Sequence, residues 1–185
     1  MATKQQKRDK SFPLWAHDNP LRRLFSPPRK LIGPYVAKAQ VVADLGCGPG
    51  FYALALAEGV GPEGKVFAVD VQEKSIRALE KKAARRGYRN IEAHASSATD
   101  LSFIKGGSVD FVLANGLLCS MAPQHHEPAV TEILRILKPQ GRAYVSAAKG
   151  AWSYVDRAEW EEILGRFKVE KKGESGDFWA VVSLK

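Results

Sequence analysis

Residues 41–52 read Val-Val-Ala-Asp-Leu-Gly-Cys-Gly-Pro-Gly-Phe-Tyr and contain the pattern that decides the fold. A short apolar run leads into glycines at alternate positions, Gly46, Gly48 and Gly50, and an alanine- and leucine-rich run follows at 53–57. This order predicts a strand, a tight turn and a helix. Glycine has no Cβ atom, so it adopts unusual φ values and lets a ligand approach the backbone. Because free N–H groups at the helix start would face that ligand, the turn predicts a site for a nucleotide-like molecule.

The glycine spacing separates two classes of nucleotide-binding protein. A dinucleotide fingerprint, Gly-x-Gly-x-x-Gly, would place its third glycine where Phe51 stands. Instead the third glycine is Gly50, and an acid, Asp44, precedes the first glycine by two residues. The pattern Asp-x-Gly-x-Gly-x-Gly resembles motif I of the class I S-adenosylmethionine-dependent methyltransferases. A nucleotide-dependent oxidoreductase on a similar sheet is the alternative that this spacing disfavours.

Length and composition indicate one domain of ordinary size. The chain has 185 residues, 45% of them hydrophobic, which is enough for a layered core. It has neither a bilayer-spanning apolar run nor a secretory signal, and its two cysteines cannot form a disulfide framework, so we expect a cytoplasmic protein. The net charge of +8 is spread over several segments, so we expect a small-molecule partner rather than nucleic acid.

Strand-like and helix-like segments alternate from residue 41 onward, which predicts a parallel sheet. The expected class is α/β, a Rossmann-like, doubly wound, mostly parallel sheet of seven strands with a C-terminal antiparallel hairpin and helices on both faces. The expected strands are 41–45, 65–70, 91–95, 109–114, 142–147, 167–172 and 178–184, and the expected helices are 28–38, 51–58, 73–86, 123–137 and 156–165.

Residues 1–40 differ in composition from the rest of the chain. Residues 1–11 are charged and predicted to be disordered, whereas 12–34 are rich in proline and apolar side chains. We interpret 1–40 as a basic tail and arm, and 41–185 as the S-adenosylmethionine-binding domain. The arm, with Phe12, Trp15 and His17, is a candidate lid over the substrate.

Further motifs extend the resemblance over residues 41–185. Val-Phe-Ala-Val-Asp ends the second strand with Asp70, which in the family binds both ribose hydroxyls of the cofactor, while Asp44 faces its methionine amino group. Residues 108–115 resemble motif IV of the family, and residues 137–142 resemble its motif at the entry to the fifth strand. The branch of the family that the chain resembles most contains the ubiquinone and menaquinone methyltransferases. The resemblance implies S-adenosylmethionine as cofactor, bound by Asp44, Gly46, Cys47, Gly48, Gly50, Phe51, Asp70, Val71, Ser97, Ala98 and Asn115.

The chain departs from the family where the adenine binds. The family often has an acid followed by alanine after the third strand, but here Ser97 and Ala98 occupy these positions, and Asp100 comes three residues after Ser97. Either the Ser97 hydroxyl or backbone amides would then hold the adenine. After the fourth strand, Asn115-Gly116-Leu117-Leu118 differs from the Asn-Pro-Pro-Tyr-like motif of many base and protein-amide methyltransferases, which disfavours that branch.

No side chain is assigned a catalytic role. His125 and His126 could supply a general base or simply begin a helix, and His94 is expected to be structural. Tyr52 could lie in the core or face the pocket. We expect Cys119 in the core, Cys47 unreactive, and no metal site, since no ligand spacing typical of metals occurs. The predicted function is methyl transfer from S-adenosylmethionine to a small molecule, with an RNA or protein acceptor, or loss of activity, as alternatives.

Overall fold

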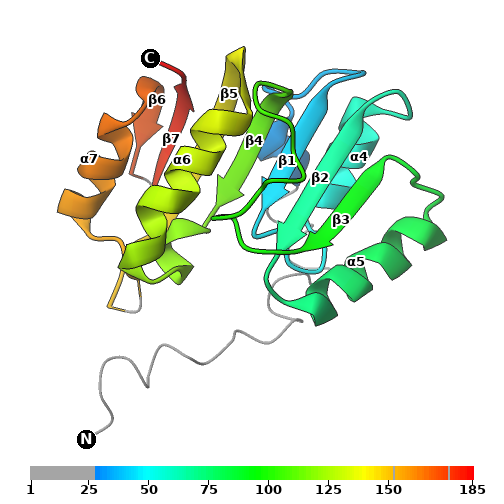
Figure 1. The fold of residues 1–185 in the computed structure, drawn as a ribbon, viewed down its shortest axis with the longest axis horizontal. Helices are drawn as coiled ribbons and strands as arrows, with labels where there is room; N and C mark the ends of the chain where they lie inside the picture. Colours follow the sequence, from blue (N-terminus) through cyan, green and yellow to red (C-terminus); the bar gives the residue numbers. More distant parts are fainter. Residues whose placement is uncertain (1–27, 152, 175) are drawn as a thin grey trace, which may run out of the picture.

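The computed structural model describes residues 28–151, 153–174 and 176–185. It contains a seven-stranded sheet of order β3-β2-β1-β4-β5-β7-β6, in which β1 to β5 run parallel and β7 is antiparallel to both its neighbours (Figure 1). The predicted α/β class, the strand count and the closing hairpin are confirmed. The strands are β1 Val41–Leu45, β2 Lys65–Asp70, β3 Ile91–Ala95, β4 Val109–Asn115, β5 Leu137–Ala148, β6 Lys168–Gly173 and β7 Asp177–Ser183.

Helices cover both faces of the sheet, as predicted. On one face α3, α4 and α5 pack against the strands, and on the other α6 and α7 do so, which gives two apolar core layers. The sheet side chains alternate between these layers, so that Val42 and Leu113 face one and Ala43 and Val112 the other. The helices are α3 Pro28–Ile32, α4 Ala53–Val60, α5 Glu73–Arg85, α6 His126–Ile136 and α7 Arg157–Gly165, with short 3₁₀ helices η1 Leu118–Ser120 and η2 Pro123–His125.

Several predicted element boundaries were wrong by a few residues. The helix expected at 51–58 begins at Ala53 and continues through Gly59 to Val60, because Gly61, with φ +72°, is the residue that ends it. The helix expected at 123–137 begins with the 3₁₀ turn η2. The fifth strand begins at Leu137 rather than Arg142, with a bulge where it joins β4.

The N-terminal arm is described only from Pro28 onward. Its helix was expected to reach Lys38 but ends at Ile32, because Pro34 lacks a backbone N–H and disfavours helical geometry at Gly33. Ile32 is buried against the layer that contains α4. The predicted disorder of 1–11 and the candidate lid residues Phe12, Trp15 and His17 lie outside the described residues.

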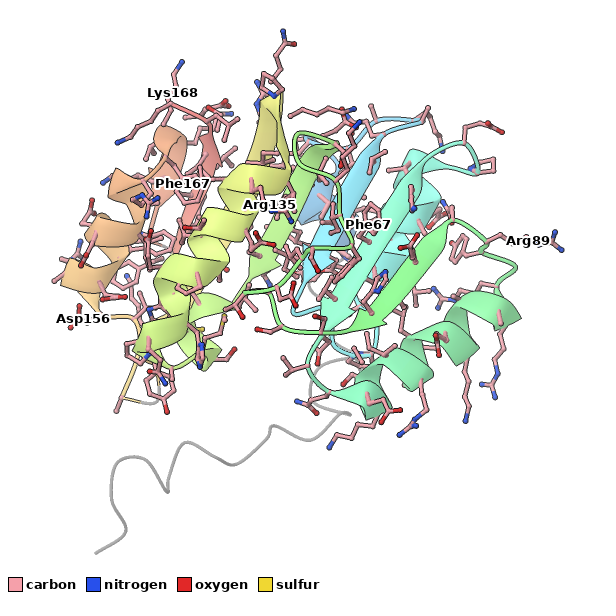
Figure 2. The ribbon with its side chains drawn as sticks, in the orientation of Figure 1. Phe67, Arg89, Arg135, Asp156, Phe167 and Lys168 are labelled. Carbon is pink, nitrogen blue, oxygen red and sulfur yellow. The ribbon has the colours of Figure 1, made fainter. Side chains whose placement is uncertain are left out.

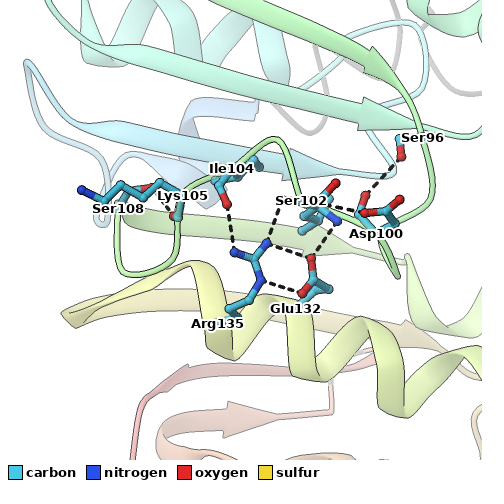
Figure 3. A network of polar contacts seen from close by, with 9 residues as sticks. Ser96, Asp100, Ser102, Ile104, Lys105, Ser108, Glu132 and Arg135 are labelled. Carbon is cyan, nitrogen blue, oxygen red and sulfur yellow. Dashed lines mark hydrogen bonds and ion pairs between the residues drawn. The ribbon is translucent and has the colours of Figure 1, made fainter.

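A loop, residues 96–108, joins β3 to β4, and α6 holds it in place (Figure 3). Arg135 donates hydrogen bonds to the carbonyl oxygens of Leu101 and Ile104, at 2.7 and 2.9 Å. Glu132 accepts one from the Leu101 N–H at 2.7 Å and pairs with Arg135. These contacts satisfy backbone groups that have no helical partner in this segment.

The helices of the described ranges are too short and too polar for a transmembrane segment: none of them combines the length and apolar character needed to cross a bilayer.

Candidate functional site

The candidate site lies where the strand order reverses, at the carboxyl ends of β1 and β4. The chain proceeds from β1 outward to β2 and β3 on one side, and from β4 to β5 on the other. In open α/β sheets this switch point leaves a crevice between the loops that leave in opposite directions. Asp44 lies near the end of β1, next to Leu113 of β4, and Asn115 ends β4. The topology therefore places most of the predicted site residues along one edge of the sheet.

The glycine turn adopts the backbone conformation that its sequence predicts. Gly46, Gly48 and Gly50 have φ values of +74°, +51° and +91°, a region that side chains with a Cβ atom rarely occupy. A Cβ atom at Gly50 would lie 2.4 Å from Leu79 Cδ1, so this glycine is needed for packing against α5. A Cβ atom at Gly48 would meet nothing within 4 Å, so this glycine borders open space.

The backbone N–H groups of the turn donate to the protein itself. Those of Gly46 and Cys47 donate to the Val69 carbonyl at 2.8 and 3.0 Å, and that of Gly50 donates to the Cys47 carbonyl at 3.1 Å. The backbone of Ala53, at the first position of α4, lowers the pKa of the Asp44 carboxyl. The N–H groups of the turn do not offer the row of free donors that a pyrophosphate needs.

Asp70 joins the glycine turn to the end of β2. Its Oδ2 accepts a hydrogen bond from the Gly48 N–H at 2.9 Å, and its Oδ1 accepts one from the Gln72 N–H at 2.8 Å. The carboxylate is partly exposed, and each of its oxygens retains a second lone pair. It can therefore accept two further hydrogen bonds, as a ribose with two hydroxyls would require.

Asp44 is a buried carboxylate with an unused oxygen. Its side chain is 3% exposed, and Oδ2 has no hydrogen-bond partner among the described residues. Burial and, to a smaller extent, the Asp70 charge raise the pKa of Asp44 from 3.8 to about 7, and the Ala53 backbone opposes both. A buried acceptor without a donor is costly, so Oδ2 is available to a hydrogen-bond donor of a ligand beside the turn.

The region expected to hold the adenine lies between the ends of β2 and β3. Val71, directly after Asp70, is 71% exposed, which is unusual for a large apolar side chain. The Ser97 Oγ lies 2.8 Å from Thr99 Oγ1 and accepts the Thr99 N–H. The Ala98 side chain is buried in the core, so only its backbone can contact a ligand there. Thr99 is a polar residue of this region that the sequence comparison did not single out.

A short polar network runs from Tyr52, at the start of α4, to Ser146 of β5 through Asn115 of β4. Asn115 Nδ2 lies 3.5 Å from the Tyr52 hydroxyl oxygen, and its Oδ1 accepts a hydrogen bond from Ser146 at 2.9 Å. The Ser146 hydroxyl also accepts the Gly116 N–H at 2.9 Å. The half-buried Tyr52 hydroxyl therefore faces the crevice side of β4, although Phe51 beside it is buried. Sequence reasoning missed Ser146, whose only signal was a polar residue within an apolar strand.

Two of the three described histidines have structural surroundings, whereas His125 is exposed at the start of α6. His126 is buried, with Nδ1 2.6 Å from Glu159 Oε1 and Nε2 2.9 and 3.0 Å from two backbone carbonyls of the segment after β4. His94 bonds to Glu92 and stacks on Phe103 with centroids 3.8 Å apart, which confirms its structural role. His126 therefore ties α6, α7 and the segment after β4 together, and it is not placed as a general base.

Both cysteines are buried, on opposite faces of the sheet. Cys47 packs in the layer of α4 and α5, and Cys119 in the layer of α6 and α7. Burial raises the pKa of both thiols, so neither is activated as a thiolate. The prediction that Cys119 belongs to the core is confirmed. The side chains of Cys47 and Phe51 are both buried, so these two residues can reach a cofactor only through their backbone.

A family model described as a methyltransferase domain matches residues 42–141, more than half of the chain. The chain is 34% identical over 106 residues to a demethylmenaquinone methyltransferase of Geobacillus stearothermophilus, a match that covers 57% of this chain and 44% of the relative. It is 30% identical over 111 residues to an arsenite methyltransferase of Halobacterium salinarum, covering 60% of this chain and 28% of the relative. The chain thus spans less than half the length of these curated relatives.

Among solved structures, the fold is similar to that of a SAM-dependent methyltransferase from Aquifex aeolicus. The TM-score is 0.77 at 24% identity, with 93% of this chain and 98% of that chain covered. The strand order, the glycine turn and the family match agree with one another. The chain belongs to the methyltransferase domain family and has the fold of the class I S-adenosylmethionine-dependent methyltransferases.

Proposed function

We propose that the protein binds S-adenosylmethionine at the β1 turn and transfers its methyl group to a small-molecule acceptor. The observation that carries the proposal is the buried Asp44 Oδ2, which has no donor among the described residues. A cationic ligand would satisfy this oxygen, and the methionine part of the cofactor carries an ammonium group. With Asp70 nearby, two carboxylates face the site, a charge pattern that suits a sulfonium cofactor and would repel a pyrophosphate.

The residues of this chain would hold the cofactor in three places. Asp44 would accept a hydrogen bond from the ammonium group of the methionine part, and Asp70 would accept hydrogen bonds from the two ribose hydroxyls. The exposed Val71 side chain would contact the adenine. Ser97 and Thr99 supply hydroxyls where the family often has an acid, so the adenine contact would be neutral. The proposed set is that of the sequence analysis, with Thr99 added.

When bound, S-adenosylmethionine supplies a methyl group that its sulfonium charge already makes electrophilic. The protein then has to hold the acceptor atom in line, about 3 Å from that carbon, and to exclude water. Tyr52 and Asn115 line the β4 side of the crevice, where they can hydrogen-bond to an acceptor. A general base is needed only for an acceptor that must lose a proton, and no described side chain is assigned that role.

The acceptor is proposed to be a small organic molecule. One relative is named for methylation of demethylmenaquinone and another for arsenite. Arsenite binding uses accessible thiols, whereas the two cysteines here are buried on opposite faces of the sheet. The organic class is therefore favoured over the metalloid.

Calorimetric titration with S-adenosylmethionine, S-adenosylhomocysteine and NAD tests the cofactor assignment. Asp70→Ala should abolish micromolar binding of the first two ligands. Asp110→Ala is the matched control, because Asp110 bonds to Val41 and Lys138 near the start of β4, away from the crevice. Binding of NAD alone, or equal loss in both variants, would contradict the proposal. Transfer of labelled methyl from the cofactor to a panel of quinols and phenols then tests the acceptor class.

A further inference from the structure

The positive charge of the described chain is concentrated on one segment. Residues 73–89 contain seven Lys and Arg side chains and two Glu, a net charge of +5. The other described residues contain fifteen basic and sixteen acidic side chains, a net charge of −1. Among the described residues, the net positive charge therefore comes from this segment, which includes one of the basic segments named from the sequence.

Six of these side chains form a continuous exposed stripe, which we call the α5 stripe: Lys74, Arg77, Lys81, Arg85, Arg86 and Arg89. Four of them, from Lys74 to Arg85, recur every three or four residues and so lie along one face of the helix, over about 16 Å. Figure 2 shows nitrogen-tipped side chains projecting outward along α5, with Arg89 at the edge of the molecule next to β3.

Most of the described basic residues outside 73–89 are paired with an acid. Lys65 pairs with Glu92, Arg142 with Glu170, and Lys172 with Glu161. On the stripe only Arg77 is paired, with Glu73. No ion pair with a described residue is recorded for the other five side chains of the α5 stripe. Holding like charges together without partners costs stability, and an anionic partner would offset this cost.

The large apolar side chains of α5 are unavailable to a partner. Ile76, Leu79 and Ala83 are buried against the sheet, so the outer face offers charge without an insertable apolar side chain. An interfacial membrane helix needs exposed apolar residues beside its cations. Four of the six stripe residues are arginines, whose planar guanidinium groups bind phosphate oxygens in a bidentate manner.

We propose that the α5 stripe binds the phosphate backbone of a nucleic-acid strand, a partner that the methyltransferase assignment does not require. The stripe begins four residues after Asp70, and Lys82 beside it donates to the Pro49 carbonyl of the glycine turn at 2.9 Å. A strand on α5 would therefore lie next to the cofactor turn. The contacts are to phosphates, so binding is independent of base sequence and strongly dependent on salt.

The test compares two triple variants of the full chain that lose the same charge. The stripe variant removes three of the six positive charges of the α5 stripe by the substitutions Lys81→Gln, Arg85→Gln and Arg89→Gln. Lys105→Gln/Lys168→Gln/Lys171→Gln removes three exposed lysines elsewhere, two of them on β6 at the opposite edge of the sheet (Figure 2). Fluorescence anisotropy measures binding to a labelled 20-nucleotide RNA and to DNA of the same sequence, between about 50 and 200 mM salt. Thermal melts establish that both variants fold.

The stripe variant should bind at least about tenfold more weakly at 50 mM salt, and the slope of log K against log[salt] should fall by about 2. The lysine control should keep most of its affinity, and both variants should bind S-adenosylmethionine like the wild type. Equal weakening of the two variants would overturn the proposal, as would salt-independent or absent binding by the wild type. Binding to anionic phospholipid vesicles but to neither nucleic acid would also overturn it. A failure here would leave cofactor binding intact and so be distinguishable from a failure of the proposed function.

Discussion

The Gly48 N–H donates to Asp70 Oδ2 across 2.9 Å, and this bond joins the turn after β1 to the acid that ends β2. The two residues are 22 positions apart in the sequence. Because Asp70 also accepts the Gln72 N–H, the start of α5 is tied to the same carboxylate. One side chain thus organises the turn and the beginning of α5 while retaining lone pairs for a ligand.

Gly48→Ala should weaken cofactor binding with little effect on stability. The φ of +51° costs about 1 kcal/mol for alanine, and no atom lies within 4 Å of the added Cβ, so the fold should accept it. The methyl group would instead enter the open space proposed for the cofactor. We expect at least about a tenfold loss of S-adenosylmethionine affinity, about 1.4 kcal/mol, in calorimetric titration. An unchanged affinity would place the cofactor elsewhere.

Gly50→Ala should act mainly on stability. Its Cβ would lie 2.4 Å from Leu79 Cδ1, and Leu79 is fully buried, so it has no space into which to move. We expect the free energy of unfolding to fall by about 2 to 4 kcal/mol in urea denaturation. Gly87→Ala is the control, since Gly87 has φ +70° with open space around it. That variant should lose only about 1 kcal/mol, and equal losses would refute the packing argument.

Asp44→Asn should stabilise the cofactor-free protein above pH 7 and abolish cofactor binding. The folded state raises the pKa of Asp44 from 3.8 to about 7, so between these values it binds a proton that the unfolded chain releases. Wild-type stability therefore falls as pH rises from about 4 to 7, by roughly 2 to 4 kcal/mol, and asparagine avoids this loss. Thermal melts at pH 5 and 8 measure the difference, and a variant less stable than wild type at pH 8 would contradict it.

The same titration predicts the pH dependence of cofactor affinity in the wild type. A cationic ligand binds the ionised carboxylate, so binding releases a proton below pH 7 and becomes weaker as pH falls. Affinity should drop by up to about tenfold per pH unit below 7 and level off above it. Calorimetry at pH 6.0 to 7.5 in buffers of different ionisation enthalpy would count the released protons. No proton release would argue against contact between Asp44 and the ammonium.

Arg135→Met should loosen the loop between β3 and β4. The Ile104 carbonyl oxygen would lose its Arg135 donor, and the Leu101 carbonyl would keep only the Ile104 N–H, at a cost of about 1 to 3 kcal/mol. Arg142→Met removes an exposed pair with Glu170 and should cost at most about 1 kcal/mol. Hydrogen exchange of residues 101–108 should accelerate in the first variant and not in the second. Unchanged exchange in both would show that other contacts hold this loop.

The regular elements could be predicted because their signals are local. Strands β1, β2 and β3 begin and end at the expected residues; Gly46 follows β1, Gly64 precedes β2, and Asp70 ends β2. The predicted ends of an element were wrong where contacts with residues distant in the sequence set those ends. The helix α4 continues through Gly59, and β5 extends back to Leu137 because it pairs with Val109 of β4.

The site could be predicted in outline and not in its electrostatics. The glycine turn and Asp70 follow from a motif, whereas the Ser146–Asn115 and His126–Glu159 contacts join residues whose meeting no local pattern indicates. The sequence left open whether His125 and His126 supply a general base or simply begin a helix, because it does not show which distant residues they meet. For His126, burial and the contact with Glu159 of α7 indicate a structural role.

The sequence by itself determined the fold class, the strand and helix order, and the positions where the chain must turn through positive φ. These properties depend on hydrophobic period and on the absence of a Cβ atom, which are local. Tertiary structure alone decided that Asp44 keeps an unpaired buried oxygen among the described residues and that five of the exposed cations at 74–89 have no ion pair with a described acid. Both depend on which distant residues become neighbours, because burial sets the cost of a charge and proximity sets whether an opposite charge offsets it.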